Sequence, residues 1–136
     1  TRVLDMGAGT GILSMAAATL WPGAVIWAVD NDPDAVETAA EVVAANGLKD
    51  RIEVSLSWKE TPVDLVLANI QRDVLLELNP LFSRNLLPGG KMVFSGILND
   101  QIDEIREKTG LPVVWNWHEG EWELVVFERP ATGESA

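Results

Sequence analysis

Three glycines at alternate positions follow a short apolar segment that ends in an acid. In the stretch VLDMGAGTGILS, residues 3–14, Asp5 precedes the glycines, which are Gly7, Gly9 and Gly11. A strand, a tight turn and a helix start in this order bring backbone amides and the positive end of a helix together, which suits a phosphate or a carboxylate. The pattern therefore predicts a nucleotide-like ligand.

The glycine spacing and the charge of Asp5 narrow the choice of ligand. A dinucleotide fingerprint has two residues between its second and third glycines, whereas one residue separates Gly9 from Gly11. The Asp5 carboxylate would repel a pyrophosphate and attract an ammonium or a sulfonium. S-adenosylmethionine carries both of these cations, together with a carboxylate and a ribose. The residues therefore favour S-adenosylmethionine over a dinucleotide.

Composition limits the classes of protein. A chain of 136 residues, 47% of them hydrophobic, predicts one domain with its own core. A net charge of -11 argues against a surface for nucleic acid or for an anionic membrane and is compatible with a basic protein partner. Without cysteine and with a single histidine, no disulfide and no metal site are expected. Without an apolar run of membrane-spanning length or a leader, we expect a soluble, cytoplasmic chain.

The elements that position the glycine turn alternate along the chain. Strands are expected at residues 2–5, 24–29, 51–56, 63–67, 91–95, 113–117 and 122–127. Helices are expected at residues 12–20, from Pro33 to just before Gly47, at 72–87 and at 99–110. The 72–87 helix is expected to break at Asn79-Pro80, where a second helix would start, and residues 87–90 predict a turn.

Strands joined by helices require a parallel sheet, whereas the short gap at residues 119–121 requires an antiparallel hairpin. The sequence therefore predicts an α/β fold: a mostly parallel twisted sheet, flanked by helices, with a closing antiparallel hairpin at one edge. Trp115 and Trp117 share one face of an expected strand, which indicates core, sheet surface or a docking site.

These motifs resemble the class I S-adenosylmethionine-dependent methyltransferases, which have a Rossmann-like fold. More narrowly, five segments are similar to the catalytic domain of the ribosomal protein methyltransferases of PrmA type: ILSMAAATL, VDNDPDAVETAAEVVAANG, VDLVLANI, LLPGGKMVFSGIL followed by Gln101, and EWELVVF. The resemblance covers nearly the whole chain. It implies a methyltransferase domain over residues 1–129. Composition predicts disorder only in a flexible tail over residues 130–136.

The resemblance also implies roles for the turn and for the end of the second strand. Gly7, Gly9 and Gly11 would admit the methionine part of the cofactor, because a side chain there would intrude or forbid the backbone angles. Asp5 would lie near the cofactor's ammonium, directly or through water. Asp30 would accept hydrogen bonds from the ribose hydroxyls.

Asn69 occupies the strand-end position where many amino-group methyltransferases of this class have Asn or Asp. Methyl transfer to nitrogen needs an uncharged amine, whereas a free lysine has a pKa of about 10.4. An amide oxygen at Asn69 would accept the amine's hydrogens and orient its lone pair, so Asn69 is the expected catalytic residue.

The adenine pocket departs from the family pattern. Asn31 and Ser57 stand where relatives usually have an apolar residue and an acid. Trp58 would cover the adenine by stacking, or would simply pack at the end of its strand.

The PrmA-type enzymes methylate amino groups of a large-subunit ribosomal protein and carry a separate N-terminal recognition domain. This chain starts at Thr1, so a fragment without that domain is expected, and its substrate is expected to be a protein amine, such as one on a basic ribosomal protein. Two alternatives stay open: a non-catalytic cofactor-binding or scaffold domain, and a small-molecule methyltransferase.

Overall fold

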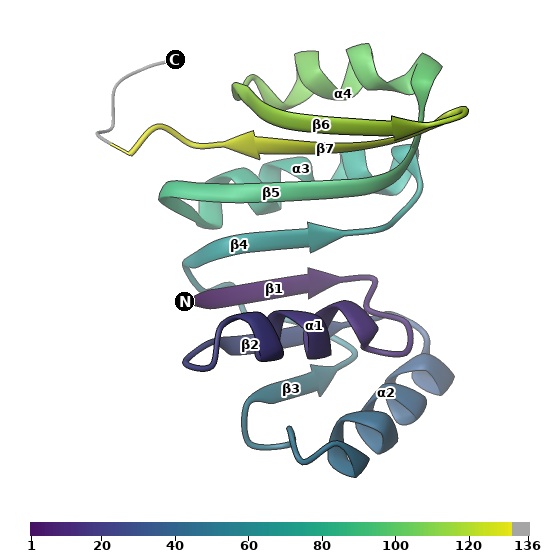
Figure 1. Cartoon of the computed structure of the whole chain (residues 1–136), viewed down its shortest axis with the longest axis vertical. Helices are drawn as coiled ribbons and strands as arrows, with labels where there is room; N and C mark the ends of the chain where they lie inside the picture. The colour runs from purple at the N-terminus through teal and green to yellow at the C-terminus, as the bar shows by residue number, and fades with distance from the viewer. Residues whose placement is uncertain (132–136) are drawn as a thin grey trace.

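A single seven-stranded sheet runs through the computed structural model, which describes residues 1–131 (Figure 1). Its strands are β1 (Arg2–Met6), β2 (Val25–Val29), β3 (Ile52–Ser55), β4 (Val63–Ala68), β5 (Leu86–Leu98), β6 (Val113–Glu119) and β7 (Trp122–Glu128). Their order is β3-β2-β1-β4-β5-β7-β6; β7 pairs antiparallel with β5 and with β6, and the other four pairs are parallel. The predicted α/β fold is confirmed. Of the predicted tail, residues 132–136 lie outside the described residues.

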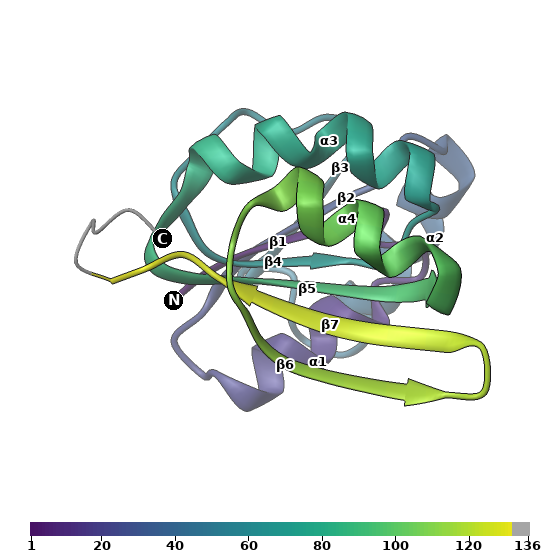
Figure 2. The same cartoon turned by 90° about the horizontal axis from the view of Figure 1, so that it is seen from above.

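Helices cover both faces of the sheet. The helical elements are α1 (Ile12–Leu20), α2 (Pro33–Ala45), α3 (Arg72–Asn85), a 3-10 turn at Asn99–Gln101, and α4 (Ile102–Thr109). α3 and α4 lie on one face and α1 lies on the other (Figure 2). Val43 of α2 belongs to the same core cluster as Ala17 and Ala18 of α1, so α2 packs on the face of α1. Within residues 1–131, no helix is long and apolar enough to cross a membrane.

The start of α2 follows directly from the sequence. The Asp32 side chain accepts a hydrogen bond from the Asp34 amide (3.0 Å), and Pro33 occupies the first turn, where its missing N–H costs nothing. Ala39 and Val43 are buried against the sheet. This cap fixes the chain immediately after β2 and therefore the place of Asp30.

The predicted break in α3 is wrong, because the helix continues through Pro80. Asn79 does not cap a new helix. Its side chain is only 7% exposed and donates a hydrogen bond to the Lys108 carbonyl oxygen at the end of α4 (3.1 Å). This contact between helices holds the segment in place although proline cannot donate a helix hydrogen bond.

The predicted turn at residues 87–90 is also wrong, because these residues lie within β5. Pairing with β4 begins at Leu86 and shifts register before Lys91, and Gly89 takes a φ of +79°. An irregularity of this kind lets a strand bend while it stays in the sheet.

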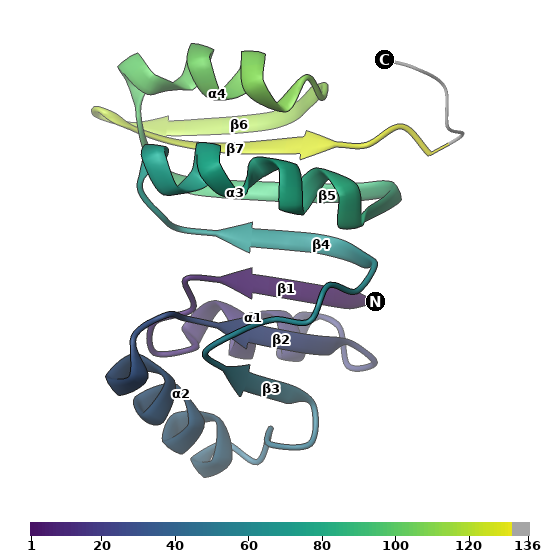
Figure 3. The same ribbon diagram turned by 180° about the vertical axis from the view of Figure 1, so that it is seen from behind.

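No helix joins β3 to β4, as the short connection predicted. Figure 3 shows this link crossing the face of the sheet. Trp58 packs against the core there, and Glu60 binds the Arg84 guanidinium (2.7 Å) and the Asn85 amide (2.7 Å) at the end of α3. These ion-pair and amide contacts hold the pKa of the Glu60 carboxyl at about 2.

We expect Asn79→Ala to lower the free energy of unfolding by about 1–3 kcal/mol, because it leaves a carbonyl at the end of α4 without its partner. Urea unfolding measures this change. Asn46→Ala is the matched control, since the exposed Asn46 amide also donates to a helix carbonyl, that of Val42 (2.8 Å). An equal loss in both variants would contradict a special role for Asn79.

Candidate active site at the carboxyl edge of the sheet

The glycine turn is anchored to the end of β2. The amides of Gly7 and Ala8 both donate to the Val29 carbonyl oxygen, at 2.8 and 3.0 Å. Gly7 has a φ of +75°, and a β-carbon there would lie 2.5 Å from the Cγ2 atom of Ile70. A side chain at this position would therefore displace the segment that follows β4.

The other two glycines differ in what surrounds them. Gly9 has a φ of +57°, and a β-carbon there would meet nothing within 4 Å. Gly11 caps α1 at a φ of +82° and lies against Ala39 and Val43 of α2, which a β-carbon would meet at 3.6 and 3.7 Å. Gly9 thus faces open space, whereas Gly11 serves the packing of α1 on α2.

Asp30 binds the turn from the end of β2. Its Oδ2 atom accepts a hydrogen bond from the Gly9 amide (2.9 Å), and its Oδ1 atom accepts one from the Asp32 amide (3.0 Å). A carboxylate has about four acceptor positions, so Asp30 keeps acceptor capacity on both oxygens. This remaining capacity suits a pair of neighbouring hydroxyl groups.

Asp5 lies beneath the turn. The carboxylate is 1% exposed and accepts a hydrogen bond from the Ser14 hydroxyl (2.7 Å). Burial raises the pKa of Asp5, hydrogen bonding from Ser14 lowers it, and the charge of Asp30 raises it. Asp5 is therefore a buried acid beneath the turn, and it does not line the cavity at the carboxyl ends of the strands.

A cavity of about 680 Å³ opens at the carboxyl ends of the parallel strands. It is lined by Gly7, Asp30, Asn31, Asn69, Ile70, Gln71, Val74, Gly96 and Trp122. Asn69 is exposed in it, and a β-carbon at Gly96 would collide with the Asn69 Oδ1 atom. Ligands of open α/β sheets bind at this edge.

The structure brings together only some of the residues singled out in the sequence. Gly7, Asp30, Asn31 and Asn69 line the cavity, whereas Ser57 and Trp58 do not, because the link after β3 turns away across the sheet. Sequence reasoning missed Gln71, Gly96 and Trp122. A glycine inside a strand signals a close approach, but the strand expected at residues 91–95 ended just before Gly96, whereas β5 extends to Leu98.

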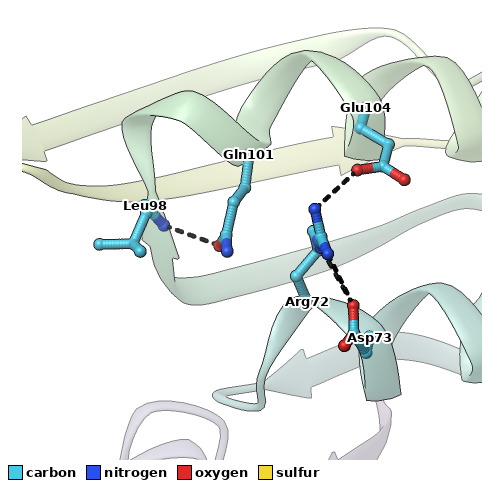
Figure 4. A network of polar contacts seen from close by, with 5 residues as sticks. All are labelled: Arg72, Asp73, Leu98, Gln101 and Glu104. Carbon is cyan, nitrogen blue, oxygen red and sulfur yellow. Dashed lines mark hydrogen bonds and ion pairs between the residues drawn. The ribbon is translucent and has the colours of Figure 1, made fainter.

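Polar contacts hold the start of α3 against α4 beside this cavity (Figure 4). The Arg72 guanidinium binds Asp73 (2.9 Å) and Glu104 (3.1 Å), and these partners raise its pKa. The Gln101 side chain accepts a hydrogen bond from the Leu98 amide (3.2 Å). These contacts fix the two segments that flank the cavity after β4 and β5.

The strand order, the glycine turn and the carboxylate that follows β2 define a domain with the Rossmann-like fold of the class I S-adenosylmethionine-dependent methyltransferases. The chain belongs to the PrmA family, described as ribosomal protein L11 methyltransferase, whose model matches residues 1–130. The resemblance noted in the sequence is thereby confirmed.

Individual relatives are similar to this chain over nearly all of its length. A ribosomal protein L11 methyltransferase from Heliobacterium modesticaldum is 39% identical over 94% of this chain and 42% of its own length. One from Pelobacter propionicus is 40% identical over 95% of this chain and 43% of its own. The chain thus spans less than half the length of these curated relatives.

Solved structures share the fold. The ribosomal protein L11 methylase from Lactobacillus delbrueckii subsp. bulgaricus has a TM-score of 0.83 at 29% identity, over 95% of this chain and 70% of that one. An RNA methyltransferase from Salinibacter ruber, solved with S-adenosyl-L-homocysteine, has a TM-score of 0.76 at 18% identity, over 99% of this chain and 84% of that one, and shows the fold alone.

We expect the Asp5 carboxylate to reduce stability at neutral pH. Because its pKa is raised in the folded state, its contribution to stability is fully present below its ordinary pKa of 3.8 and is lost as pH rises through the folded pKa. The free energy of unfolding of the wild type, relative to Asp5→Asn, should therefore increase as pH falls.

Chemical denaturation across a pH series measures this difference. Ser14→Ala removes the hydroxyl that favours the charged form, so it should move the transition to higher pH. A difference that instead grows in favour of the wild type as pH rises would contradict this account of Asp5.

Proposed function

We propose that this chain is the catalytic domain of an S-adenosylmethionine-dependent methyltransferase that acts on amino groups of a protein. The observation that carries the proposal is the cavity of about 680 Å³ at the sheet edge, which is lined by Gly7, Asp30 and Asn69 in a chain of the PrmA family. The cofactor, the reaction and the substrate class all belong to this proposal.

The residues present fit S-adenosylmethionine. Gly9 leaves open space where a methyl side chain would stand, which admits a ligand close to the backbone. Asp30 retains acceptor positions for the ribose hydroxyls. The buried Asp5 lies under the turn, where a negative charge favours a ligand's ammonium without touching it. Asn31 would lie beside the adenosine part.

Two assignments from the sequence receive weaker support. Ser57 is exposed and Trp58 packs against the core, so neither lies against the cavity. A role for them in holding adenine therefore stays a prediction. The cytoplasmic location also stays a prediction.

Asn69 is the residue proposed to orient the amine. When bound, S-adenosylmethionine supplies a methyl group: the amine lone pair forms the N–C bond as the C–S bond breaks, and the nitrogen's proton passes to water. The Asn69 carboxamide oxygen can accept a hydrogen bond from an uncharged amine and aim its lone pair. Contact with Gly96 limits the positions open to this side chain.

The relatives' names support a protein substrate. Those curated proteins are called ribosomal protein L11 methyltransferases, and a net charge of -11 is compatible with a basic protein partner. A non-catalytic domain or a small-molecule methyltransferase would share the cofactor cavity, so release of a methylated protein is the discriminating result.

Gly9→Ala and Gly47→Ala form a matched pair for the cofactor proposal. Gly47 has a φ of +70° and, like Gly9, has nothing within 4 Å of an added β-carbon. Each change should cost about 1–2 kcal/mol of stability through backbone strain. S-adenosylhomocysteine should raise the melting temperature of the wild type and of Gly47→Ala, and should raise that of Gly9→Ala far less. Equal shifts of the melting temperature in both variants would contradict contact between the glycine turn and the ligand.

Asn69→Ala should lower kcat by about 10²-fold, because the amine loses the group that orients it. S-adenosylhomocysteine affinity should change little. Transfer of a labelled methyl group to an L11-type protein measures kcat, and Asn85→Ala, at the opposite end of α3, is the control. An unchanged kcat in Asn69→Ala would contradict the proposal that Asn69 orients the amine.

A further inference from the structure

One part of the sheet is bare on the face that carries α1 and α2. α1 lies over β1 and β2, whereas within residues 1–131 no helix covers this face of β5, β7 and β6 (Figure 1). Pairing between strands shows which side chains point there. Trp115 lies opposite Val126 and Trp117 lies opposite Leu124, while Val125 is buried in the core on the other face.

The bare face is strongly aromatic. Trp115 is 54% exposed and Trp117 is 53% exposed, and Trp122, which alternation along β7 puts on the same side as Leu124, is 52% exposed. We call Trp115, Trp117, Leu124 and Val126 the tryptophan face. Contiguous exposed apolar surface of this kind marks an interaction site.

The charge around the tryptophan face has one sign. Residues 113–128 contain four glutamates and neither lysine nor arginine. Glu119 alternates onto the side of Trp115 and Trp117, whereas Glu123 lies opposite the core residue Ile97 on the other side. Glu119 lies opposite Trp122 at the end of β6 nearest the cavity. Lys91 of β5 pairs with Glu128 (3.0 Å), which is the last residue of β7 and lies at the end of that strand away from the cavity. Exposed indole rings beside carboxylates bind lysine and arginine side chains through cation–π and ionic attraction.

The tryptophan face is continuous with the proposed active site. A cavity of about 280 Å³ is lined by Trp117, Glu119 and Trp122 and extends to Gly96. Gly96 and Trp122 also line the main cavity that contains Asn69. A chain lying on the tryptophan face would therefore lead directly to Asn69.

We propose that the tryptophan face docks a lysine- or arginine-containing segment of the methylated protein, next to the amine that enters the main cavity. This inference rests on the proposed function. Trp115 and Trp117 bind the cationic side chains through their exposed rings, and Glu119 pairs with a charge close to the cavity. The occupant is a basic polypeptide segment, not a second copy of this chain.

A ten-residue oligolysine serves as the probe, and indole N–H signals in ¹H–¹⁵N spectra report its position. The chain has six tryptophans. Signals of Trp115, Trp117 and Trp122 should shift on titration, while those of Trp21 and Trp27 should not. A ten-residue oligoglutamate should shift none of them.

Variants separate a docking site from general charge attraction. Trp117→Ala and Glu119→Gln should each weaken oligolysine binding about three- to tenfold. Glu41→Gln, an equal charge change on the exposed side of α2, should leave the affinity unchanged. Equal weakening by Glu41→Gln would overturn the proposal, as would binding that leaves the tryptophan face unshifted.

Two further measurements test the docking proposal. Shifts of the same indole signals with protein concentration alone would show that a second copy occupies the face, and would overturn the proposal. S-adenosylhomocysteine titrated into the same sample tests the proposed function separately. If it binds while oligolysine does not reach the face, docking alone fails. If it does not bind, the proposed function fails and this inference fails with it.

Discussion

The attachment of the glycine turn to the end of β2 is the constraint on which the site depends. Two backbone amides share the Val29 carbonyl oxygen, and a third, from Gly9, binds the Asp30 carboxylate. These bonds require left-handed backbone angles that glycine adopts without strain. They bring the end of β1, the start of α1 and the acid after β2 together. Gly9 and Asp30, which the third bond joins, are 21 residues apart in the sequence.

The same turn constrains the far wall of the cavity. Because Gly7 approaches Ile70 so closely, the segment after β4 cannot shift toward β1, and Gly96 in turn limits Asn69 from the side of β5. Three adjacent strands, β1, β4 and β5, thus position one cavity. Asp5 shows the cost of this arrangement, since a carboxylate is buried where an apolar side chain would be more stable.

Local sequence was enough to predict the features that depend on neighbouring residues. The glycine turn, the Asp32 cap and the closing hairpin are encoded by spacing within a few positions, and the hairpin's short gap determined the antiparallel strand. Family resemblance indicated Asp30 and Asn69 as strand-end residues, and the structure places both on the cavity. Their roles in binding and catalysis stay predictions.

Features that depend on distant contacts could not be predicted in this way. Asn79 has the local signature of a helix cap, but its actual partner is the Lys108 carbonyl of α4. Gly89 suggests a turn, but pairing with β4 keeps it in a strand. Trp122 belongs to the cavity only because β7 returns antiparallel beside β5.

The central claim is that the cavity at the sheet edge binds S-adenosylmethionine through the glycine turn and Asp30. Calorimetric titration of this chain with S-adenosylhomocysteine, with NAD in parallel, tests it most directly. The account predicts one-to-one binding of S-adenosylhomocysteine, no heat from NAD, and at least about a tenfold loss of affinity in Asp30→Ala. Binding of NAD, or S-adenosylhomocysteine binding that Asp30→Ala leaves unchanged, would contradict it.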